Sequence, residues 1–256
     1  MKNIYFLSDA HLGCRALSHQ RTLERRLVRF LDTIKDKAEA VYLLGDMFDF
    51  WFEYTDVVPK GFTRFLGKLS DLTDNGVEVH FFVGNHDMWV GDYLQKECGI
   101  IIHHEPYTAE LCGQVFLIAH GHLIEAKDSS LAERMMMWCF RNKFLQRMAR
   151  MIHPHWFISF GYRWARHSHI NHHNKETNVP KGGSEEKLVA FAKQYLQTHP
   201  DINYFMFGHR HIDLDQQIAP DTRVLVLGQW YSLFTYAVFN GTTLTTHHYI
   251  EGETQL

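Results

Sequence analysis

The sequence predicts an α/β protein in which two β-sheets pack face to face with helices outside. In the first half of the chain, short apolar runs alternate with segments of helical periodicity, which is typical of a largely parallel sheet. These runs are nearly continuous in apolar residues, as expected for strands buried on both faces. The last quarter holds several β-like runs between turn signals, which predicts an antiparallel partner sheet.

The elements of the first half follow from periodicity and turn residues. Asp74-Asn75-Gly76 marks the turn before the third strand, and Gly113 divides a later pair of strands as in a hairpin. The expected strands are 4–7, 41–44, 77–83, 100–103, 106–112 and 114–119, and the expected helices are 18–36, 61–74 and 90–97.

The second half begins with a helical region and ends in strands. Residues 129–175 are helical in pattern, and Pro154 predicts a division into two helices. Lys181-Gly182-Gly183-Ser184 is the expected exit turn, and Asn240-Gly241 is a hairpin signal. The remaining expected elements are a helix at 184–198 and strands at 203–207, 212–218, 223–228, 233–239 and 243–250. We expect a single domain over residues 1–256, with a helical cap inserted at approximately 123–182.

Composition argues against several classes of protein. The chain has 256 residues, a formal net charge of -3 and a pI near 6.7, so it lacks the basic surface of a general nucleic-acid-binding protein. Its four cysteines are scattered without a CxxC pair, which indicates reduced thiols in a cytosolic protein. We expect no signal peptide, because the N-terminal apolar run is too short. No stretch approaches the roughly 20 apolar residues that span a bilayer.

Five short segments carry metal-binding residue types, and each follows an apolar run. They are Asp9-Ala10-His11, Gly45-Asp46-Met47-Phe48-Asp49, Gly84-Asn85-His86-Asp87, His120-Gly121-His122 and Gly208-His209-Arg210-His211. Taken singly, each is explained as well by a helix cap, a turn or surface histidines. Their joint occurrence favours a common site, since residues that follow strand ends converge on one rim of a sheet.

The residue types predict a site for two divalent metal ions. Asp46 is the expected bridge, because a carboxylate can give one oxygen to each ion. Two pairs of candidate ligands lie two residues apart, so both members of a pair can face the same way. Nitrogen and oxygen ligands without thiolate suit Mn, Fe, Zn or Ni better than Mg, Ca or Cu(I). The expected ligands are Asp9, His11, Asp46, Asn85, His120, His209 and His211.

This ordered set resembles the calcineurin-like metallophosphoesterase family, whose pattern runs D-x-H, G-D-x-x-D, G-N-H-[DE], H and G-H-x-H. The resemblance covers the motifs across residues 9–211. It implies a four-layer α/β/β/α metallophosphoesterase sandwich with a helical lid insertion. It also implies that Asp46 is shared by the two ions. The other ligands would be Asp9, His11 and His211 for one ion and Asn85, His120 and His209 for the second.

Such a site predicts hydrolysis of a phosphoester or pyrophosphate. Two ions neutralise the phosphate oxygens and convert bound water to hydroxide, which attacks phosphorus in line with the leaving group. His86 is the expected catalytic histidine, which protonates the leaving oxygen or stabilises its charge. Asp49 resembles the family's carboxylate that orients this histidine. Two interpretations of His122 stay open: a donor just outside the ligand set that contacts the substrate, or a polar residue near the mouth.

Residues 131–166 differ in composition from the rest of the chain. They hold seven basic residues against one acidic residue, a net charge of +6 in an acidic protein. Met136, Phe140, Phe144 and Met148 recur every four residues, which predicts one apolar stripe along a helix. The ordinary interpretation is a helical cap whose apolar residues are core. The coincidence of basic and apolar residues favours a lid for a lipid-bearing anion, since methionine adapts to irregular apolar shapes and basic amphipathic helices lie on anionic membranes.

The insertion and the run Gly45-Asp46-Met47-Phe48-Asp49-Phe50-Trp51 resemble the UDP-2,3-diacylglucosamine hydrolases. The resemblance implies Mn²⁺-dependent cleavage of the pyrophosphate of UDP-2,3-diacylglucosamine, giving 2,3-diacylglucosamine 1-phosphate (lipid X) and UMP in lipid A biosynthesis. It implies a nucleotide-linked glycolipid as partner and a cytoplasmic enzyme whose cap touches the cytoplasmic face of the inner membrane. Candidate substrate contacts are Asn85, His122, Arg141, Arg166 and Lys175. The chain departs from the better-known members, which have arginine at His86 and HGD in place of His120-Gly121-His122.

Two other functions were weighed beside this one. A phosphodiesterase or phosphatase for a soluble nucleotide or phosphoprotein would share the motifs but has no need for an apolar, basic-edged insertion. A non-catalytic binding module would have lost ligands or the catalytic histidine, whereas every expected position is filled here. The histidine-rich stretch 167–173 is expected to be incidental. No nucleic-acid partner is expected, and no oligomeric state follows from the sequence.

Overall fold

The computed structural model describes residues 2–17, 19–126, 130–173 and 186–250. Its strands are β1 (Asn3–Leu7), β2 (Ala38–Leu43), β3 (Glu78–Phe82), β4 (Ile101–His103), β5 (Tyr107–Leu111), β6 (Gln114–Ile118), β7 (Tyr204–Phe207), β8 (Leu214–Ala219), β9 (Thr222–Val226), β10 (Thr235–Phe239) and β11 (Leu244–His248). They form one sheet in the order β11-β10-β1-β2-β3-β4 and a second in the order β5-β6-β7-β9-β8.

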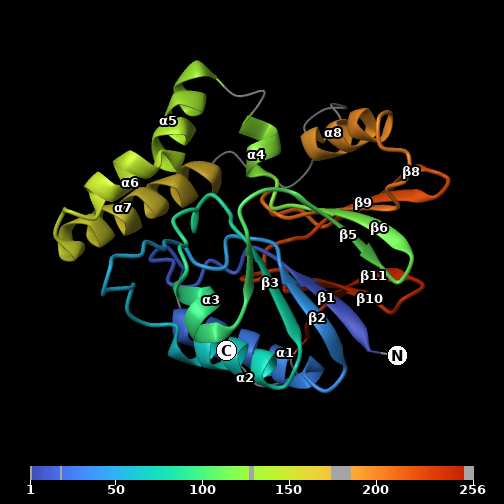
Figure 1. Cartoon of the computed structure of the whole chain (residues 1–256), viewed down its shortest axis with the longest axis horizontal. Coiled ribbons are helices and arrows are strands. Elements are labelled where there is room, and N and C mark those ends of the chain that lie inside the picture. Colours follow the sequence, from blue (N-terminus) through green and yellow to red (C-terminus); the bar gives the residue numbers. More distant parts are fainter. Residues whose placement is uncertain (1, 18, 127–129, 174–185, 251–256) are drawn as a thin grey trace.

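Helices cover the outer faces of both sheets (Figure 1). The helices are α1 (Gln20–Ile34), α2 (Thr63–Asp74), α3 (Tyr93–Cys98), α4 (His122–Glu125), α5 (Leu131–Arg141), α6 (Lys143–Ala149), α7 (Pro154–His173) and α8 (Lys187–Leu196). Apolar faces of α1, α2 and α3 pack on the first sheet, and those of α4 and α8 pack on the second. The predicted α/β/β/α layering is therefore confirmed.

The two sheets bury an apolar layer between them. Phe6 of β1 stacks on Tyr42 of β2 and on Phe116 of β6, with ring centroids 5.1 Å and 5.9 Å apart. Side chains of the same strands also pack against the outer helices, which explains why these strands are apolar at nearly every position. Each such fully buried side chain stabilises the fold by about 1.5–3 kcal/mol relative to exposure.

The terminal hairpin lies in a different sheet from the one expected. β1, β2, β3 and β4 run parallel, and the hairpin of β10 and β11 joins the free edge of β1 in antiparallel pairing. Only β8 and β9 join β7 in the second sheet, so the prediction that all terminal strands form the partner sheet was wrong. An unpaired edge at β1 would leave open backbone donors and acceptors, and the hairpin satisfies them.

Helices α5, α6 and α7 form a cap beside the sandwich (Figure 1). The cap region contains more than the two long helices predicted, because Asn142 ends one helix and begins the next. Its side chain accepts hydrogen bonds from Phe144 N at 2.9 Å and Leu145 N at 3.2 Å, the geometry of an N-cap. The bounds of the inserted cap, and the expected exit turn at 181–184, remain predictions since residues 127–129 and 174–185 lie outside the described residues. Among the described helices, none is both long and apolar enough to cross a membrane.

Candidate metal centre

The structure brings the seven predicted ligands to one rim. The loops after β1, β2 and β3 of the first sheet meet those after β6 and β7 of the second, at the carboxyl ends of parallel strands. Three groups of side chains offer ligand atoms that lie within 4.8 Å of one another: Asp9 with His11 and His211, His11 with Asp46 and His86, and Asp46 with His120 and His209. Asn85 joins them through its Oδ1, which lies 3.3 Å from His120 Nε2.

The backbone at these ligands adopts a conformation that side chains ordinarily avoid. In the part of the chain that the structure describes, nine residues other than glycine have positive φ, and five of them are predicted ligands. Those five are Asp9, His11, Asp46, His209 and His211, with φ from 44° to 69°. Left-handed backbone at non-glycine residues costs on the order of 1–3 kcal/mol each and gathers at functional sites. The rest of the fold thus holds these side chains in place against local strain.

Glycines in the same motifs allow the loops to approach one another. A Cβ at Gly84 would collide with the Asp46 carboxylate, and one at Gly208 would collide with the hydroxyl of Ser8. Gly45 has φ +89, and a Cβ there would lie 2.6 Å from His120 Nδ1. The glycines before Asp46, Asn85 and His209 therefore have a steric reason, which is the space needed by side chains of another loop of the site.

The donor set fits two divalent cations. Asp9, Asp46 and Asp49 are almost fully buried, and that much negative charge away from water needs compensation. Asp9 Oδ1 has no hydrogen-bond partner among the described residues. Asp46 Oδ2 lies 3.9 Å from His11 Nε2 on one side and 3.3 Å from His120 Nε2 on the other, so this carboxylate stands between the two predicted ligand groups. When bound, two such ions neutralise phosphate oxygens and lower the pKa of water.

Electrostatic coupling among these groups is strong. Against the effect of burial, His120 and His86 hold the pKa of Asp46 well below its ordinary value. Burial likewise opposes charge on His120, but the Asp46 carboxylate raises the pKa of His120 to about 9. Burial lowers the pKa of His11 to about 4, and burial with His120 lowers that of His209 well below its usual range. His11 and His209 are therefore neutral near pH 7, the form in which imidazole binds a metal.

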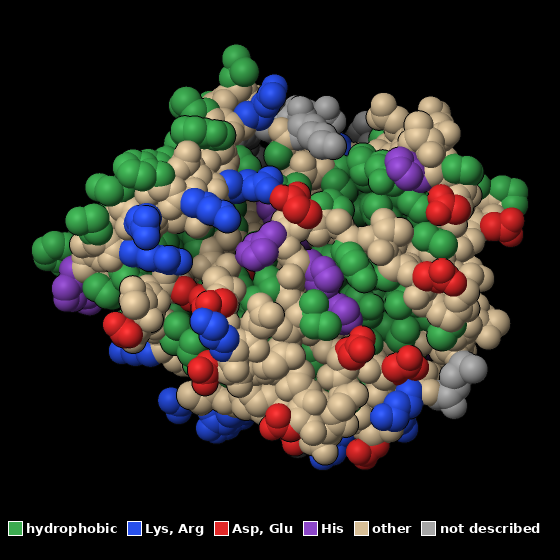
Figure 2. All heavy atoms as spheres, viewed as in Figure 1, with side chains coloured by type: hydrophobic (Ala, Val, Ile, Leu, Met, Phe, Trp, Pro, Cys, Tyr) green, Lys and Arg blue, Asp and Glu red, His purple; other side chains and the backbone are tan. Residues whose placement is uncertain are grey.

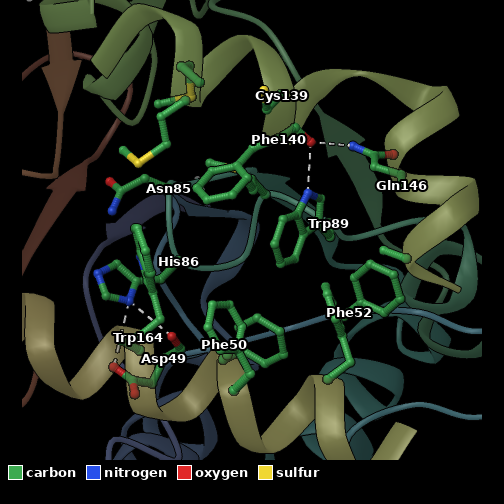
Figure 3. A pocket seen from close by; sticks show the side chains of 18 of the residues that line it. Asp49, Phe50, Phe52, Asn85, His86, Trp89, Cys139, Phe140, Gln146 and Trp164 are labelled. Carbon is green, nitrogen blue, oxygen red and sulfur yellow. Dashed lines mark hydrogen bonds and ion pairs between the residues drawn. The ribbon is translucent and has the colours of Figure 1, made fainter. Parts of the chain in front are cut away.

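His86 is oriented by Asp49, although not in the expected way. His86 Nδ1 donates to the backbone carbonyl of Asp49 at 2.9 Å, while the nearest carboxylate oxygen is 3.7 Å away (Figure 3). The carboxylate lies closer to His11, at 3.5 Å from Nδ1. Since a carbonyl only accepts hydrogen bonds, Nδ1 carries the proton, and Nε2 is the nitrogen with which His86 can act on a substrate. The catalytic role of both residues stays a prediction.

The predicted substrate contacts separate into two sets. Asn85 and His122 line a cavity beside the ligands. His122 is buried, and burial together with His120 lowers its pKa to about 3. Arg141 pairs with Glu105, and neither Arg141 nor the exposed Arg166 is among the described residues that line the cavity. Lys175 lies outside the described residues, as do the side chains of 167–173.

One buried carboxylate at the site was not singled out from the sequence. Asp87 accepts hydrogen bonds from Met47 N at 2.9 Å, Phe48 N at 3.3 Å and Gly84 N at 2.7 Å. It therefore ties the loop that carries Asp46 to the loop that carries Asn85. Burial and the Asp46 charge raise its pKa to about 7. The sequence signal that could have identified Asp87 is its position as the acidic residue at the end of the motif Gly84-Asn85-His86-Asp87.

A cavity of about 670 Å³ runs from the ligands into the cap. One end is polar and contains Asn85, His86, His122 and His209. The walls of the remainder are mostly apolar and come from the loops after β2 and β3 and from all three cap helices (Figure 3). They include Phe50, Phe52, Trp89, Met136, Phe140, Leu145, Phe157 and Trp164. The volume is within the roughly 300–1,000 Å³ usual for ligand sites.

Comparison with known proteins agrees with this geometry. The family model for calcineurin-like phosphoesterases matches residues 2–213. The chain is 43% identical over 250 residues to a UDP-2,3-diacylglucosamine hydrolase from Porphyromonas gingivalis, covering 94% of this chain and 95% of that protein. It is 29% identical to the enzyme of the same name from Neisseria gonorrhoeae, covering 91% of each chain. The chain therefore belongs to the calcineurin-like phosphoesterase family and is a metal-dependent phosphoester hydrolase.

Proposed function

We propose that the protein hydrolyses the pyrophosphate bond of UDP-2,3-diacylglucosamine to 2,3-diacylglucosamine 1-phosphate and UMP, a step of lipid A biosynthesis. The observation that carries the proposal is one continuous cavity. Its polar end contains Asn85, His86 and His209, and its apolar part extends to the cap. A substrate with a pyrophosphate joined to acyl chains matches both ends. The names of the two similar enzymes support the same substrate.

The chain's own side chains have distinct tasks in this reaction. Water adds across the P–O–P bridge: its hydroxyl bonds to one phosphorus, and a proton must reach the bridging oxygen as its bond to that phosphorus breaks. His86 would supply this proton from Nε2 when its ring carries a proton on both nitrogens; the Asp49 carbonyl holds the Nδ1 proton, and the ring is left with that proton alone once the bridging oxygen has taken the other. Asn85 and His122 line the cavity next to it and would hold phosphate oxygens. Manganese is our expectation for the resident ions, since the ligands are nitrogen and oxygen.

The apolar part of the cavity would hold the acyl chains. Phe50 and Phe157 lie 6.4 Å apart between ring centroids, and Gly161 of α7 packs so closely on Phe50 that a Cβ there would collide with the ring. Met136, Met137 and Met88 add flexible side chains to the lining. Methionine adapts to irregular apolar shapes, which suits chains without fixed conformation.

The outer surface of the cap is suited to a membrane. Apolar side chains of α5, α6 and α7 and of the turn between α6 and α7 are strongly exposed, among them Leu131, Met135, Trp138, Phe144, Met151, Trp156 and Phe160. In Figure 2, hydrophobic side chains gather over the cap, with basic side chains beside them. Exposed apolar groups with arginines are typical of helices that lie in an anionic bilayer surface. This surface supports our proposal that the protein is held peripherally on a membrane through the cap; the cytoplasmic face of the inner membrane is the location that we propose.

The proposal is tested by loading the protein with Mn²⁺ and measuring UMP release from UDP-2,3-diacylglucosamine. Controls are UDP-glucosamine without acyl chains and an aryl phosphodiester. We expect turnover per KM at least about 100-fold higher for the acylated substrate, because burial of each methylene contributes about 0.8 kcal/mol. Equal rates on the acylated and unacylated nucleotides would instead identify a phosphodiesterase for soluble substrates.

A pair of glycine variants checks the location of the acyl chains. Gly161→Ala places a methyl group where the Phe50 ring lies, so that ring, which lines the cavity, has to move, whereas Gly67→Ala on α2 meets nothing within 4 Å. We expect Gly161→Ala to raise KM for the glycolipid about tenfold and leave the aryl phosphodiester unaffected. Gly67→Ala should match the unmodified protein on both substrates. An unchanged KM in Gly161→Ala would remove the chains from this cavity.

A further inference from the structure

The last turn of α5 receives two side-chain hydrogen bonds on one carbonyl. Trp89 Nε1 donates to the Phe140 carbonyl at 2.8 Å, and Gln146 Nε2 of α6 donates to the same oxygen at 2.7 Å (Figure 3). Carbonyls in the last turn of a helix have no partner within the helix, so this oxygen is available to outside donors. The two donors differ in origin. Gln146 belongs to the cap, whereas Trp89 follows His86 by three residues in the loop after β3.

The indole ring of Trp89 lies between the cap and the catalytic loops. Its centroid is 5.2 Å from Phe140 and 5.7 Å from Phe157, both in the cap. On the other side it is 5.7 Å from Phe50 and 5.4 Å from Phe52, which follow the Asp46 loop. The backbone of Trp89 also pairs with that of Phe52 in an isolated β-bridge. Trp89 therefore touches the cap, the Asp46 loop and its own His86 loop at once.

Trp89 differs from the buried tryptophan of the preceding loop. The ring of Trp51 is fully buried, and its Nε1 donates to Glu53 Oε1 at 2.9 Å within the sandwich. The hydrogen bond of Trp89 instead crosses to the cap. Arg150 makes another polar contact across this boundary, from Nε to the Glu53 carbonyl at 3.0 Å, but Glu53 lies four residues beyond Asp49. Trp89 is three residues from His86 along the chain and donates to the cap through its own side chain.

We infer that Trp89 is a positioning residue that couples occupation of the cap cavity to the placement of His86. Trp89 and Phe140 both line the cavity, so apolar chains that fill it press on both partners of this hydrogen bond. Closing α5 on the indole holds the short segment from His86 to Trp89 against the cap. Part of the free energy of binding the acyl chains then raises kcat, and the rest strengthens substrate binding. The inference rests on the proposed function, because it assigns the chains to that cavity.

The kinetic test compares two variants that each remove one donor to the same carbonyl. Trp89→Phe keeps an aromatic ring and loses the N–H, while Gln146→Leu loses the donor that lies within the cap. We expect Trp89→Phe to lower kcat for UDP-2,3-diacylglucosamine about tenfold at nearly unchanged KM. Its metal content and its rate on an aryl phosphodiester, which does not reach the cap, should stay within about twofold of the unmodified protein. Gln146 also lines the cavity, so Gln146→Leu should act on KM for the glycolipid and leave kcat within about twofold on both substrates.

Two kinetic outcomes would overturn the inference. An unchanged kcat on the glycolipid would show that the hydrogen bond carries no coupling. An equal loss on both substrates, or a loss of metal, would make Trp89 an ordinary structural residue of the loop.

Amide hydrogen exchange supplies a readout that needs no substrate. Trp89→Phe should speed exchange both in α5 and α6 and in residues 84–90, whereas Gln146→Leu should affect the cap helices alone. Exchange that changes only in the cap in both variants contradicts the coupling. If the unmodified protein releases no UMP from the glycolipid, the proposed function fails, and this exchange comparison still decides whether the cap and the His86 loop move together.

Discussion

The metal rim buries charged groups away from water, whereas the cap exposes apolar groups to water. At the rim, Asp9, His11 and Asp49 are fully buried, and the backbone of several ligands is strained. On the cap, Met151 is 78% exposed and Trp156 is 71% exposed, although both are apolar. Burying charge at the rim costs free energy, and so does exposing apolar surface on the cap. We expect both costs to be offset by partners, namely cations at the rim and, as proposed above, a membrane at the cap.

The rim is the region that we expect to carry out the reaction, and the cap is the region that we expect to recognise the lipid part of the substrate. Residue type decides what the rim can do, since a carboxylate, an amide or an imidazole is needed at each position. The outer surface of the cap is proposed to act through the sum of its apolar and basic side chains, so substitutions of its exposed residues should have small effects on the reaction itself. The following predictions test that division.

The largest effect should come from the carboxylate between the two ligand groups. Asp46→Asn removes a negative charge and one strong ligand atom while keeping the volume of the side chain. We expect loss of bound metal and a fall in activity of at least about 10³-fold, since metal ions contribute several kcal/mol to the transition state. Metal analysis and UMP release measure the two effects. Glu39→Gln on the exposed part of β2 is the control, and full activity in Asp46→Asn would end the assignment of the bridge.

His86→Ala should separate catalysis from metal binding within the rim. A group that transfers a proton contributes roughly 10²–10⁴-fold, so turnover should fall by that order while metal content stays the same. The comparison is made with purified protein and parallel metal analysis. Activity equal to that of the unmodified protein would remove His86 from the mechanism, and loss of metal would make it a ligand.

On the cap, exposed apolar side chains should affect membrane binding but not the hydrolysis reaction. The double variant Met151→Ser with Trp156→Ser should weaken binding to anionic liposomes at least about tenfold, since two large side chains no longer enter the interface. Hydrolysis of an aryl phosphodiester should not change. The matched control is Val57→Ser with Ile250→Ser, which removes exposed apolar groups outside the cap. Equal binding by both double variants would argue against the cap as the membrane surface.

The smallest effect concerns the pH at which the metal-free protein is most stable. Burial lowers the pKa of His11 to about 4 and that of His122 to about 3, and burial together with His120 holds the pKa of His209 well below its ordinary value. The unfolded chain takes up these protons below about pH 6.5, so stability is lost as the pH falls below that value. Burial raises the pKa of Asp87 to about 7, so below that pH the folded protein holds a proton that the unfolded chain lacks. This offsets one of the three protons taken up by the histidines on unfolding. The net acid slope is on the order of 1–3 kcal/mol per pH unit.

On the alkaline side the sign reverses. The pKa of His120 is raised to about 9 by Asp46 in spite of burial, so its stabilisation is complete below about pH 6.5 and is lost as the pH rises through 9. Thermal denaturation with a chelator should therefore show a maximum near pH 6.5–7. With metal bound, the alkaline decline should disappear, because a metal-bound His120 has no such proton to lose. A flat curve without metal would contradict the buried, coupled state of these histidines.

The rim could be predicted from the sequence because ligand type and chain position coincide there. Asp9, Asp46, Asn85 and His209 each follow a strand by a short loop, so strand order alone brings them together. The left-handed backbone at several of them was not predictable, since nothing in the residue type of histidine demands positive φ.

The cap was less predictable because its local signals compete. The four-residue spacing from Met136 to Met148 favours one helix, but Asn142 satisfies the amides of a new helix and interrupts it. As a result Met136 and Phe140 line the cavity, whereas Phe144 and Met148 are exposed. The terminal hairpin was assigned to the wrong sheet for a related reason: its apolar pattern fits either sheet, and only the open edge of β1 selects one.

The strained backbone at Asp9, Asp46 and His209 has a consequence for anyone who wishes to make this enzyme more heat-resistant. Glycine at such positions would relax the chain and raise the melting temperature of the metal-free form. Every such gain would remove a side chain that we predict to bind a metal ion. Searches for hardier variants that score only folding will converge on these positions and return inert proteins, so they should be excluded from any such library in advance.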